Sequence, residues 1–423
     1  MAGVGENRRT SSASGFPMTA TPPSGSRPAI AFLFVIALMD VMASSLPIPV
    51  LPSLVQSFTH STRNAGSSYG LLVAIWAAMQ FIFSPVIGAL SDTYGRRPVL
   101  LISSAGLAVD WVLMALAPNL WWLVVVRLIA GVVSSSMPAA FAYIADITPP
   151  EQRARAFGLI GAAWSAGFVV GPALGGALAA WGPRTPFWVA SAMTALSFLF
   201  GYFMLPESLP HDRRTPFSWR RANPLGALRL LGSHAELKGL ATVNFLHSFA
   251  YYVIFVVYVL YARNRFSFSL FEIGLLMGLM GVLDIPVQGW LVGKVVARIG
   301  DRWTMVAGFT AAGSGLLLMS VAPNRWVFAA ALLPLALYTL AIPTIQSLMS
   351  ARVSEREQGQ LQGANTSTGS VAGIVAPIVF GWTYSLTAET MPGSSFALAG
   401  FFFLIAAIIG SRFGKASQGV QPA

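Results

Sequence analysis

The sequence predicts an all-α polytopic membrane protein with twelve transmembrane helices, arranged as two pseudo-symmetric six-helix bundles. Three observations predict it: a very apolar composition, apolar stretches of membrane-spanning length that recur along the chain, and a repeat that relates its two halves. Of the 423 residues, 55% are hydrophobic and 10% are charged, whereas about 25% of the residues in soluble domains are charged. A chain this apolar lacks the polar groups to cover a surface in water, so lipid is its expected solvent.

Apolar stretches recur along nearly the whole chain. A helix needs about 20 residues to cross the hydrocarbon core of a bilayer, and it satisfies its own backbone polar groups, which lipid cannot do. We expect one transmembrane helix in each of twelve stretches. They are residues 30–54, 69–90, 99–116, 120–145, 157–180, 187–205, 240–261, 273–296, 305–321, 326–349, 363–385 and 396–409.

The basic residues are distributed unevenly between the segments that join these helices. The net charge is +11, and 20 of the 26 Lys and Arg residues fall on the side of the two chain ends, against five in the opposite loops. Cytosolic segments of membrane proteins carry such an excess of positive charge. We therefore expect a multi-pass protein with both termini in the cytosol. Because membrane topology accounts for the positive charge, no nucleic-acid partner is expected.

Composition divides the chain into five parts. The first 28 residues are rich in Ser, Pro, Gly and Thr and lack the apolar stretch of a signal peptide. A polar stretch with several arginines and prolines separates the sixth span from the seventh. The expected parts are a disordered cytosolic tail at 1–28, a six-helix bundle at 29–206, a cytosolic central loop at 207–238, a second six-helix bundle at 239–413 and a cytosolic tail at 414–423.

The two halves share two patterns at the same offset of 205 residues. The first pattern is GALSDTYGRR and GKVVARIGDR, and the second is GLIGAAWSAGFVVGPALGG and GANTSTGSVAGIVAPIVFG. Two matches at one offset indicate a duplication, and six-helix repeats are a transporter architecture with the substrate site between the halves. The matched pairs include Gly88 and Gly293, Gly95 and Gly300, Arg97 and Arg302, Pro172 and Pro377, and Gly176 and Gly381.

The loop after the second span carries the first motif, with Gly88, Asp92, Gly95, Arg96 and Arg97. Asp92 lies at the cytosolic end of a span, where it can form a salt bridge to a neighbouring helix or loop in one conformational state only. Such a charge would be a latch that biases a two-state motion. The alternative is that the two arginines only anchor the topology.

The fifth span carries a second motif of five glycines and a proline. Small residues four apart let helices approach closely, and a proline inside a helix removes a backbone hydrogen bond and bends it. Ordinary helix packing is the alternative, although this spacing is more specific than a single GxxxG. The motif residues are Gly158, Gly167, Gly171, Pro172, Gly175 and Gly176.

Both motifs resemble those of the major facilitator superfamily, and within it those of twelve-span drug:proton antiporters. The resemblance is strongest to the tetracycline-efflux group and extends through MDVMASSLPIPVLPSL, GALSDTYGRRPVLL, AVDWVLMALAPNLWWLVVVRLIAGV and IADITPPEQRARAFG. It implies an exporter of the bacterial inner membrane that exchanges small amphipathic compounds, tetracycline or related drugs, for protons by alternating access. It also favours the latch interpretation of Asp92.

Four ionisable residues lie inside the expected spans, where each costs about 2.5–3.5 kcal/mol and is a functional candidate. Asp40 lies about 15 Å into the first span, ahead of three prolines. Its carboxylate is interpreted as a substrate or proton site, with a polar contact to a neighbouring helix as the alternative.

Asp110 and Arg127 lie at matching distances from Pro118, on either side of an expected outer turn. Opposite charges at equal depth on adjacent helices can pair and offset each other's desolvation. The pair is either structural or part of proton coupling. In the tetracycline-efflux family the matching residues are needed for transport, which favours coupling.

Asp284 lies near the middle of the eighth span, followed by Pro286. Because burial disfavours the charged form of a carboxylate, such a group can take up a proton from one side and release it to the other. The alternative is a packing contact. The tetracycline exporters have a histidine here, and their aspartate of span 9 corresponds to Ala312, so the substrate identity stays open.

An apolar cavity with a few polar groups suits an amphipathic ligand. Polar and aromatic residues in mid-span regions are the candidates to line it, although a lone His247 is more often a packing residue. The substrate-binding candidates are Asp40, Gln80, Asn244, His247, Tyr251, Tyr252, Asp284, Gln288 and Gln346.

Several functions lack the motifs they require. The sequence contains no nucleotide-binding GxxxxGK[ST], no catalytic constellation, no metal cluster and no cysteine, so we expect neither an enzyme nor an ATP-driven pump, and no resident cofactor.

The expected partners are protons, lipid and a small-molecule drug, with a divalent cation that travels with the substrate as an open question, and the expected state is a monomer. The alternatives are a proton-coupled metabolite importer or exporter and a transport-inactive membrane receptor.

Overall fold

The structure is a computed structural model that describes residues 27–219, 235–354 and 357–413. Residues 1–26 of the expected tail at 1–28, residues 220–234 of the expected central loop at 207–238 and the expected tail at 414–423 therefore lie outside the described residues, whereas residues 27 and 28 already belong to the first helix. The elements of the first half, all helical, are α1 Arg27–Ser45, α2 Leu51–Thr59, α3 Thr62–Tyr94, α4 Arg96–Ala115, α5 Leu120–Val133, α6 Met137–Ile147, α7 Pro150–Leu178, η1 Ala179–Trp181 and α8 Thr185–Met204.

The second half is also helical and contains no strand over the residues described. A short 3-10 turn, η2 His211–Arg213, lies in the segment between the halves. The elements are α10 Ala235–Val256, α11 Tyr258–Phe266, α12 Leu270–Pro286, the π-helix η3 Val287–Leu291, α13 Val292–Ser320, α14 Arg325–Ala330, α15 Leu332–Ala336, the 3-10 helix η4 Leu337–Leu340, α16 Ala341–Ser350, α17 Gln358–Thr387 and α18 Ser394–Gly410.

Twelve spans are found in the described part of the chain. Nine helices are long and apolar enough to cross a membrane, and two shorter apolar helices, Phe34–Ser45 and Ser394–Gly410, accompany them. One of the nine, Leu270–Ser320, is 51 residues long and holds a non-helical Gly300, so it is two spans joined end to end. This confirms the expected all-α membrane fold.

The duplicated sequence patterns adopt duplicated structures. Gly95 joins α3 to α4 with φ 107° and ψ 158°, and Gly300, 205 residues later, interrupts α13 with φ 75° and ψ 168°. Both values lie where L-residues with a Cβ are strained, which explains the glycines. The structure reveals a further matched pair outside these two patterns, because Asn119 and Asn324 are also 205 residues apart and cap α5 and α14 with their side chains.

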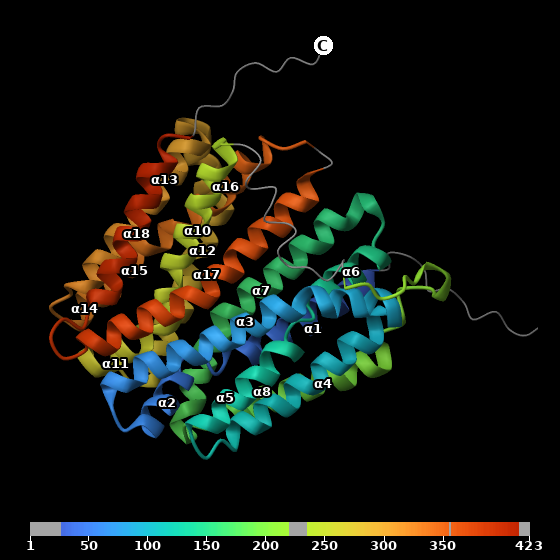
Figure 1. Cartoon of the computed structure of the whole chain (residues 1–423), viewed down its shortest axis with the longest axis horizontal. Coiled ribbons are helices and arrows are strands. Elements are labelled where there is room, and N and C mark those ends of the chain that lie inside the picture. Colours follow the sequence, from blue (N-terminus) through green and yellow to red (C-terminus); the bar gives the residue numbers. More distant parts are fainter. Residues whose placement is uncertain (1–26, 220–234, 355–356, 414–423) are drawn as a thin grey trace, which may run out of the picture.

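The two halves touch mainly along two helix pairs, α3 with α17 and α7 with α12, and smaller contacts join α2 and α3 to α11. We call the end of the molecule with Gly95 and Gly300 the inner end, and the end with α2 and α11 the outer end. Figure 1 shows the bundles lying together at α2 and α11 and diverging toward the opposite end.

Backbone contacts close the outer end. A Cβ placed on Gly70 of α3 would collide with the carbonyl oxygen of Pro377, and one on Gly274 of α12 would collide with that of Pro172. Pro172 and Pro377 are a duplicated pair, so the repeat has placed the same proline-on-glycine contact at both interfaces. We call these contacts the outer seal.

Hydrogen bonds between the halves supplement the outer seal. Gln56 of α2 donates to Asn264 Oδ1 of α11 at 3.1 Å, and the backbone N–H of Ser67 donates to Ser385 Oγ at 2.8 Å. Asn264 in turn donates to the hydroxyl of Tyr384 at 3.2 Å. These are few and mostly neutral hydrogen bonds, each worth about 0.5–1.5 kcal/mol, so the contact can open.

The inner end lacks such contacts. A Cβ placed on Gly158 or Gly161 of α7, on Gly289 of η3, or on Gly293 of α13 would meet no described atom within 4 Å. Glycines of the same kind are therefore packed backbone to backbone at one end and open at the other. The structure is a transporter-like state that is closed at the outer end and open at the inner end.

A larger side chain at Gly70 is expected to open the outer seal. Overpacking at a close contact costs about 1–3 kcal/mol, so Gly70→Leu shifts the population toward outer opening by about tenfold. The chain has no cysteine, so the labelling rate of a thiol introduced by Ser385→Cys, now 8% exposed, measures the opening. Gly161→Leu is the matched control and leaves the rate unchanged. An equal rate in both variants would contradict this account of the seal.

Candidate functional site

A cavity of about 350 Å³ lies between the two halves. Its wall combines aromatic rings with hydroxyl and amide groups, as expected for a site that binds an amphipathic molecule. Elements α3, α10, η4 and α17 contribute. The lining residues are Trp76, Ala77, Gln80, Ser248, Tyr251, Tyr252, Phe255, Tyr338, Thr366, Gly369 and Ser370.

The first half contributes Trp76 and Gln80, one turn apart on α3. Trp76 Nε1 donates to Ser134 Oγ at 3.2 Å, and Gln80 Nε2 donates to the same hydroxyl at 2.8 Å. Ser134 follows the end of α5, so this hydroxyl fixes both side chains on the wall. Gln80 was predicted from the sequence as a lining residue, whereas Ser134 was not.

The second half contributes a stacked aromatic pair. The rings of Tyr251 and Tyr338 are parallel within 16°, with centroids 4.6 Å apart. Tyr252 also lines the cavity. Of the predicted candidates, Gln80, Tyr251 and Tyr252 therefore line the cavity. Tyr338 was missed, because only its contacts set it apart from the many aromatic residues of the chain.

Asn244 and His247 lie behind this wall. His247 is buried, with Nδ1 3.1 Å from the Tyr338 hydroxyl and Nε2 3.0 Å from Asn244 Oδ1. Its ring stacks on Phe309 of α13 at 5.3 Å between centroids. Both predicted residues therefore reach the cavity through Tyr338 rather than by lining it.

Asp284 lies near the end of α12 and is not among the residues that line the cavity, although its charge acts on Tyr251 and Tyr338, which do line it. Pro286 follows and lacks the N–H that would continue the α-helical hydrogen bonds. The chain then forms the π-helix η3, a feature that often marks functional positions. Asp284 is thus linked to the cavity by the effect of its charge on two lining tyrosines and not by lining the cavity itself.

Two predicted candidates point elsewhere. Gln288 of η3 and Gln346 of α16 have exposed side chains and are not among the residues that line the cavity. Ala312, at the position of the span 9 aspartate in tetracycline exporters, is fully buried in α13.

Asp40 lies in the first half, away from the lining residues. Ser197 of α8 is its neighbour, and Asp40 Oδ1 is buried without a hydrogen-bond partner. Val41 and Ser45 occupy the adjoining face of α1, against α7. The rotation of α1 therefore directs Asp40 toward α8, which its depth in the sequence did not reveal. The prolines behave as expected, because α1 ends at Ser45, ahead of Pro47.

Asp110 of α4 and Arg127 of α5 come together as the depth argument predicts. Arg127 Nη2 lies 3.9 Å from Asp110 Oδ2, and their side chains are 11% and 1% exposed. Neither carboxylate oxygen of Asp110 makes a hydrogen bond to a described residue, and neither do Nε and Nη2 of Arg127. A buried ion pair held by charge alone, without hydrogen bonds, is poorly compensated for desolvation.

The motif of the fifth span places α7 between two neighbours. Gly167, Gly171 and Gly175, spaced by four, form the face against α1, where Ser45 Oγ donates to the carbonyl of Gly167 at 3.1 Å. Pro172 and Gly176 form the face against α12 of the other half. Gly158 differs, because no described atom approaches it. The motif therefore packs α7 against α1 of its own half and against α12 of the other half.

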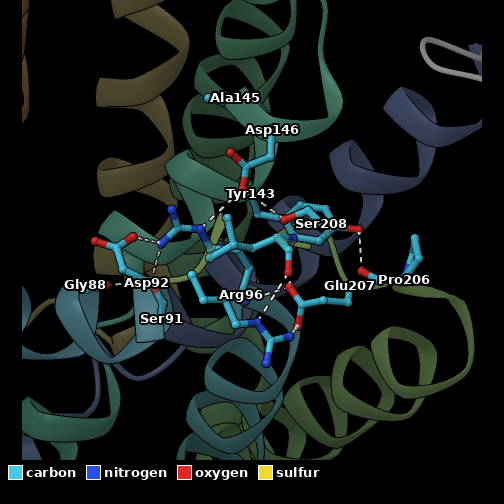
Figure 2. A network of polar contacts seen from close by, with 12 residues as sticks. Gly88, Ser91, Asp92, Arg96, Tyr143, Ala145, Asp146, Pro206, Glu207 and Ser208 are labelled. Atoms are coloured by element: carbon cyan, nitrogen blue, oxygen red, sulfur yellow. Dashed lines mark hydrogen bonds and ion pairs between the residues drawn. The ribbon is translucent and has the colours of Figure 1, made fainter. Parts of the chain in front are cut away.

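The loop with Gly95 is held by a polar network at the inner end, shown in Figure 2. Arg96 pairs with Asp92 one turn earlier and with Asp146 of α6, where Nε and Oδ2 are 3.3 Å apart. Its backbone N–H donates to Glu207 Oε1 at 2.8 Å. Glu207 also occupies the space that a Cβ on Gly95 would need. Asp146 and Glu207 could not be predicted from the sequence, because their contacts with Arg96 cross 50 and 111 residues.

The remaining predicted residues of this loop also contact the first half. Arg97 donates to the carbonyl of Tyr202 at 2.6 Å and lies over its ring at 5.7 Å, and the carbonyl of Gly88 accepts from Ser91 Oγ. The carbonyl of Asp92 accepts from the N–H of Thr215 at 3.1 Å. In the open-inside state, the side chain of Asp92 thus pairs within its own loop.

Two six-span bundles that enclose a cavity and are closed at one end define a membrane transporter. The Major Facilitator Superfamily model matches residues 33–377 and 240–421, and the chain belongs to this family. It is 35% identical to the class C tetracycline resistance protein of Escherichia coli, over 87% of this chain and 92% of that protein. It is 36% identical to the class G tetracycline resistance protein of Vibrio anguillarum, over 89% and 95%. The crystal structure of the human organic anion transporter MFSD10 (TETRAN) matches with a TM-score of 0.67 and 25% identity, over 92% of this chain and 100% of that chain.

Neutralising one member of the buried pair is expected to destabilise the protein more than neutralising both. Arg127→Gln leaves Asp110 buried without its counter-charge, a change that costs about 3–5 kcal/mol, whereas Asp110→Asn combined with Arg127→Gln removes both charges. Thermal unfolding in detergent, followed by tryptophan fluorescence, should give a lower Tm for the single variant than for the double variant. Arg63→Gln, at an exposed arginine of α3, is the control. A single variant as stable as the double variant would contradict a mutually compensating pair.

Proposed function

We propose that the chain is a proton-coupled exporter of small amphipathic organic compounds, tetracyclines foremost, that works by alternating access in the bacterial inner membrane. The observation that carries this proposal is the aromatic and polar cavity of about 350 Å³ between the halves, which is closed at the outer end and is lined by two tyrosines on which the charge of Asp284 acts. A substrate from the inner side reaches such a site, and a carboxylate beside it can exchange protons with either side.

The curated relatives support the choice of substrate. Two proteins named for tetracycline resistance match over nearly the full length, with at least 35% identity. The cavity suits a planar molecule, because its stacked tyrosines offer an aromatic face and Gln80 offers amide contacts. A divalent cation bound to the drug would travel as cargo, so no resident cofactor is needed.

The charge distribution supports the orientation. The inner end carries the excess of Lys and Arg, including Arg96 and Arg97, and because cytosolic segments carry such an excess, this end and both termini would lie in the cytosol. With this orientation the structure is open to the cytosol, the side from which an exporter loads.

Alternating access would exchange the outer seal for a seal at the inner end. The proline-on-glycine contacts and the Gln56–Asn264 hydrogen bond open, while the open glycines of α7 and η3 become the inner contact surface. In that state Asp92 would leave Arg96 for a partner in the second half, which is the latch role expected from the sequence.

Ionisable residues in both halves would take part in proton coupling. Asp110 and Arg127 in the first half, held by charge alone, would separate when the Asp110 carboxylate takes up a proton or when another charged partner arrives. Asp284 acts beside the substrate in the second half. Asp40, against α8, would respond to protons rather than contact the substrate, and the protein would work as a monomer because both halves of the site come from one chain.

Expression in a pump-deficient bacterium is expected to raise the minimal inhibitory concentration of tetracyclines. Asp110→Asn, Arg127→Ala and Asp284→Asn each remove a charge required for coupling and lower resistance at least about tenfold, a change that corresponds to 1.4 kcal/mol, and Asp40→Asn does the same. Immunoblots of membranes confirm equal expression, and Glu389→Gln, at an exposed loop carboxylate, is the neutral control. Normal resistance in all four variants would refute these assignments.

The direction of transport is expected to be drug out and proton in. Inside-out membrane vesicles acidify their lumen when they respire, so an antiporter accumulates labelled tetracycline in them, and nigericin, which dissipates the pH gradient, releases it. A proton-coupled importer would instead concentrate substrate in right-side-out vesicles. Vesicles that carry Asp284→Asn are the control. Accumulation that is insensitive to nigericin would exclude proton antiport.

A further inference from the structure

We infer that two glycines of α17, Gly369 and Gly373, set the width of the cavity and thereby the size of the compounds that it admits. This inference rests on the proposed function, which places the substrate in this cavity, and it adds two residues that determine specificity. Gly369 acts on the cavity directly, whereas Gly373 acts by positioning Tyr252.

Gly369 lies on the cavity wall, where a side chain would occupy space that a substrate needs. It is one of the lining residues, and a Cβ placed on it would meet no described atom within 4 Å. The glycines of the outer seal are required by a carbonyl oxygen that packs against them, but no such contact explains Gly369. Because glycine in a helix interior is less stable than alanine, the open cavity in front of this residue is the physical reason for a glycine here.

Gly373, one turn later on α17, makes room for a side chain of the facing helix α10. A Cβ placed on Gly373 would lie 2.5 Å from the hydroxyl oxygen of Tyr252 and 3.0 Å from its Cζ, which is too close for either atom. Tyr252 also lines the cavity. Protein interiors are close-packed, so the cavity is the unfilled space into which a displaced ring would move. Gly373 therefore holds Tyr252 back on the wall.

The sequence repeat shows that the equivalent helix of the first half carries large side chains at these two positions. At the offset of 205 residues, Gly369 corresponds to Trp164 of α7 and Gly373 to Phe168. The helices α7 and α17 are equivalent in the structure too, because each contacts the other half through a proline of the outer seal. The rings of Trp164 and Phe168 have centroids 6.2 Å apart. The cavity thus lies beside the helix that has two glycines in place of two aromatic rings.

The width that the glycines leave favours rigid compounds with several fused rings. The stacked rings of Tyr251 and Tyr338 offer such a compound an aromatic face. A fused-ring molecule cannot bend around a side chain that projects into its site, whereas a small or flexible molecule can. Side chains at the two glycine positions are therefore expected to exclude wide, rigid compounds before narrow ones.

The test measures the width of the cavity without any drug. Ser248 of α10 is a lining residue, and the chain has no cysteine, so Ser248→Cys places a single thiol on the wall. The purified protein in lipid nanodiscs is labelled with N-ethylmaleimide or with fluorescein maleimide, which react alike and differ in size. Gly369→Leu and Gly373→Ala are each expected to lower the rate with fluorescein maleimide about tenfold, a typical effect of overpacking, and to leave the rate with N-ethylmaleimide unchanged.

Two further variants separate this role from a general effect on the helix. Gly359→Ala, on the same helix where a Cβ would meet no described atom, is the matched control and leaves both rates unchanged. Tyr252→Phe removes the atom nearest to the new Cβ, and the remaining Cζ needs only a small shift. Adding it is expected to restore the fluorescein maleimide rate of the Gly373→Ala variant but not that of the Gly369→Leu variant. A change in helix stability alone would not respond to Tyr252 in this way.

The same variants connect the width to transport. At equal amounts in the membrane, Gly369→Leu and Gly373→Ala are expected to lower tetracycline resistance, and Tyr252→Phe to recover it in the Gly373→Ala variant. An unchanged ratio of the two labelling rates in both glycine variants, no rescue by Tyr252→Phe, or normal tetracycline resistance despite a narrowed cavity would overturn the inference. An unsubstituted protein that confers no tetracycline resistance would instead refute the proposed substrate, and the labelling ratios would still decide whether the two glycines set the width.

Discussion

The structure depends on how closely two helix backbones can approach each other at the outer end. In the outer seal, prolines of α7 and α17 direct carbonyl oxygens at Gly274 and Gly70, where any side chain would collide. Such contacts form without long side chains that must be ordered, and they separate without exposing buried charges. The halves can therefore close firmly at one end and still part, which is the mechanical requirement for a cavity that opens to alternate sides.

Much of this architecture could be predicted from the sequence. Composition and the lengths of the apolar stretches predict the spans, and the shared offset of two motifs predicts the duplicated contacts, because the matched Pro172 and Pro377 occupy equivalent interfaces. The Asp110–Arg127 pair could be predicted because both residues are anchored to one short turn, so that depth along the helix determined the contact. These features could be predicted because each depends on sequence periodicity or on the geometry of a short segment.

The rest depends on rotation and on long-range contacts, which spacing does not encode. Asp40 has the expected depth but faces α8, because α1 presents Val41 and Ser45 to α7. Tyr338 and His247 lie 91 residues apart and meet only after α10 and η4 have packed. An aromatic residue in an aromatic-rich chain gives no local signal that its hydroxyl bonds to a buried histidine.

The two copies of the duplicated loop differ in the contacts that hold them to the rest of the protein. Around Gly95, ion pairs and Glu207 tie the joint between α3 and α4 to the rest of the first bundle. Ala297 and Asp301 stand where that copy has Asp92 and Arg96, and no described atom lies near a Cβ on Gly300. The joint at Gly300, inside α13, is held less firmly: over the described residues Asp301 accepts a hydrogen bond from Ser347 Oγ but forms no ion pair. In the proposed alternating access, the joint at Gly300 would bend more readily than the joint at Gly95, so the two bundles would move unequally even though they share a duplicated sequence pattern.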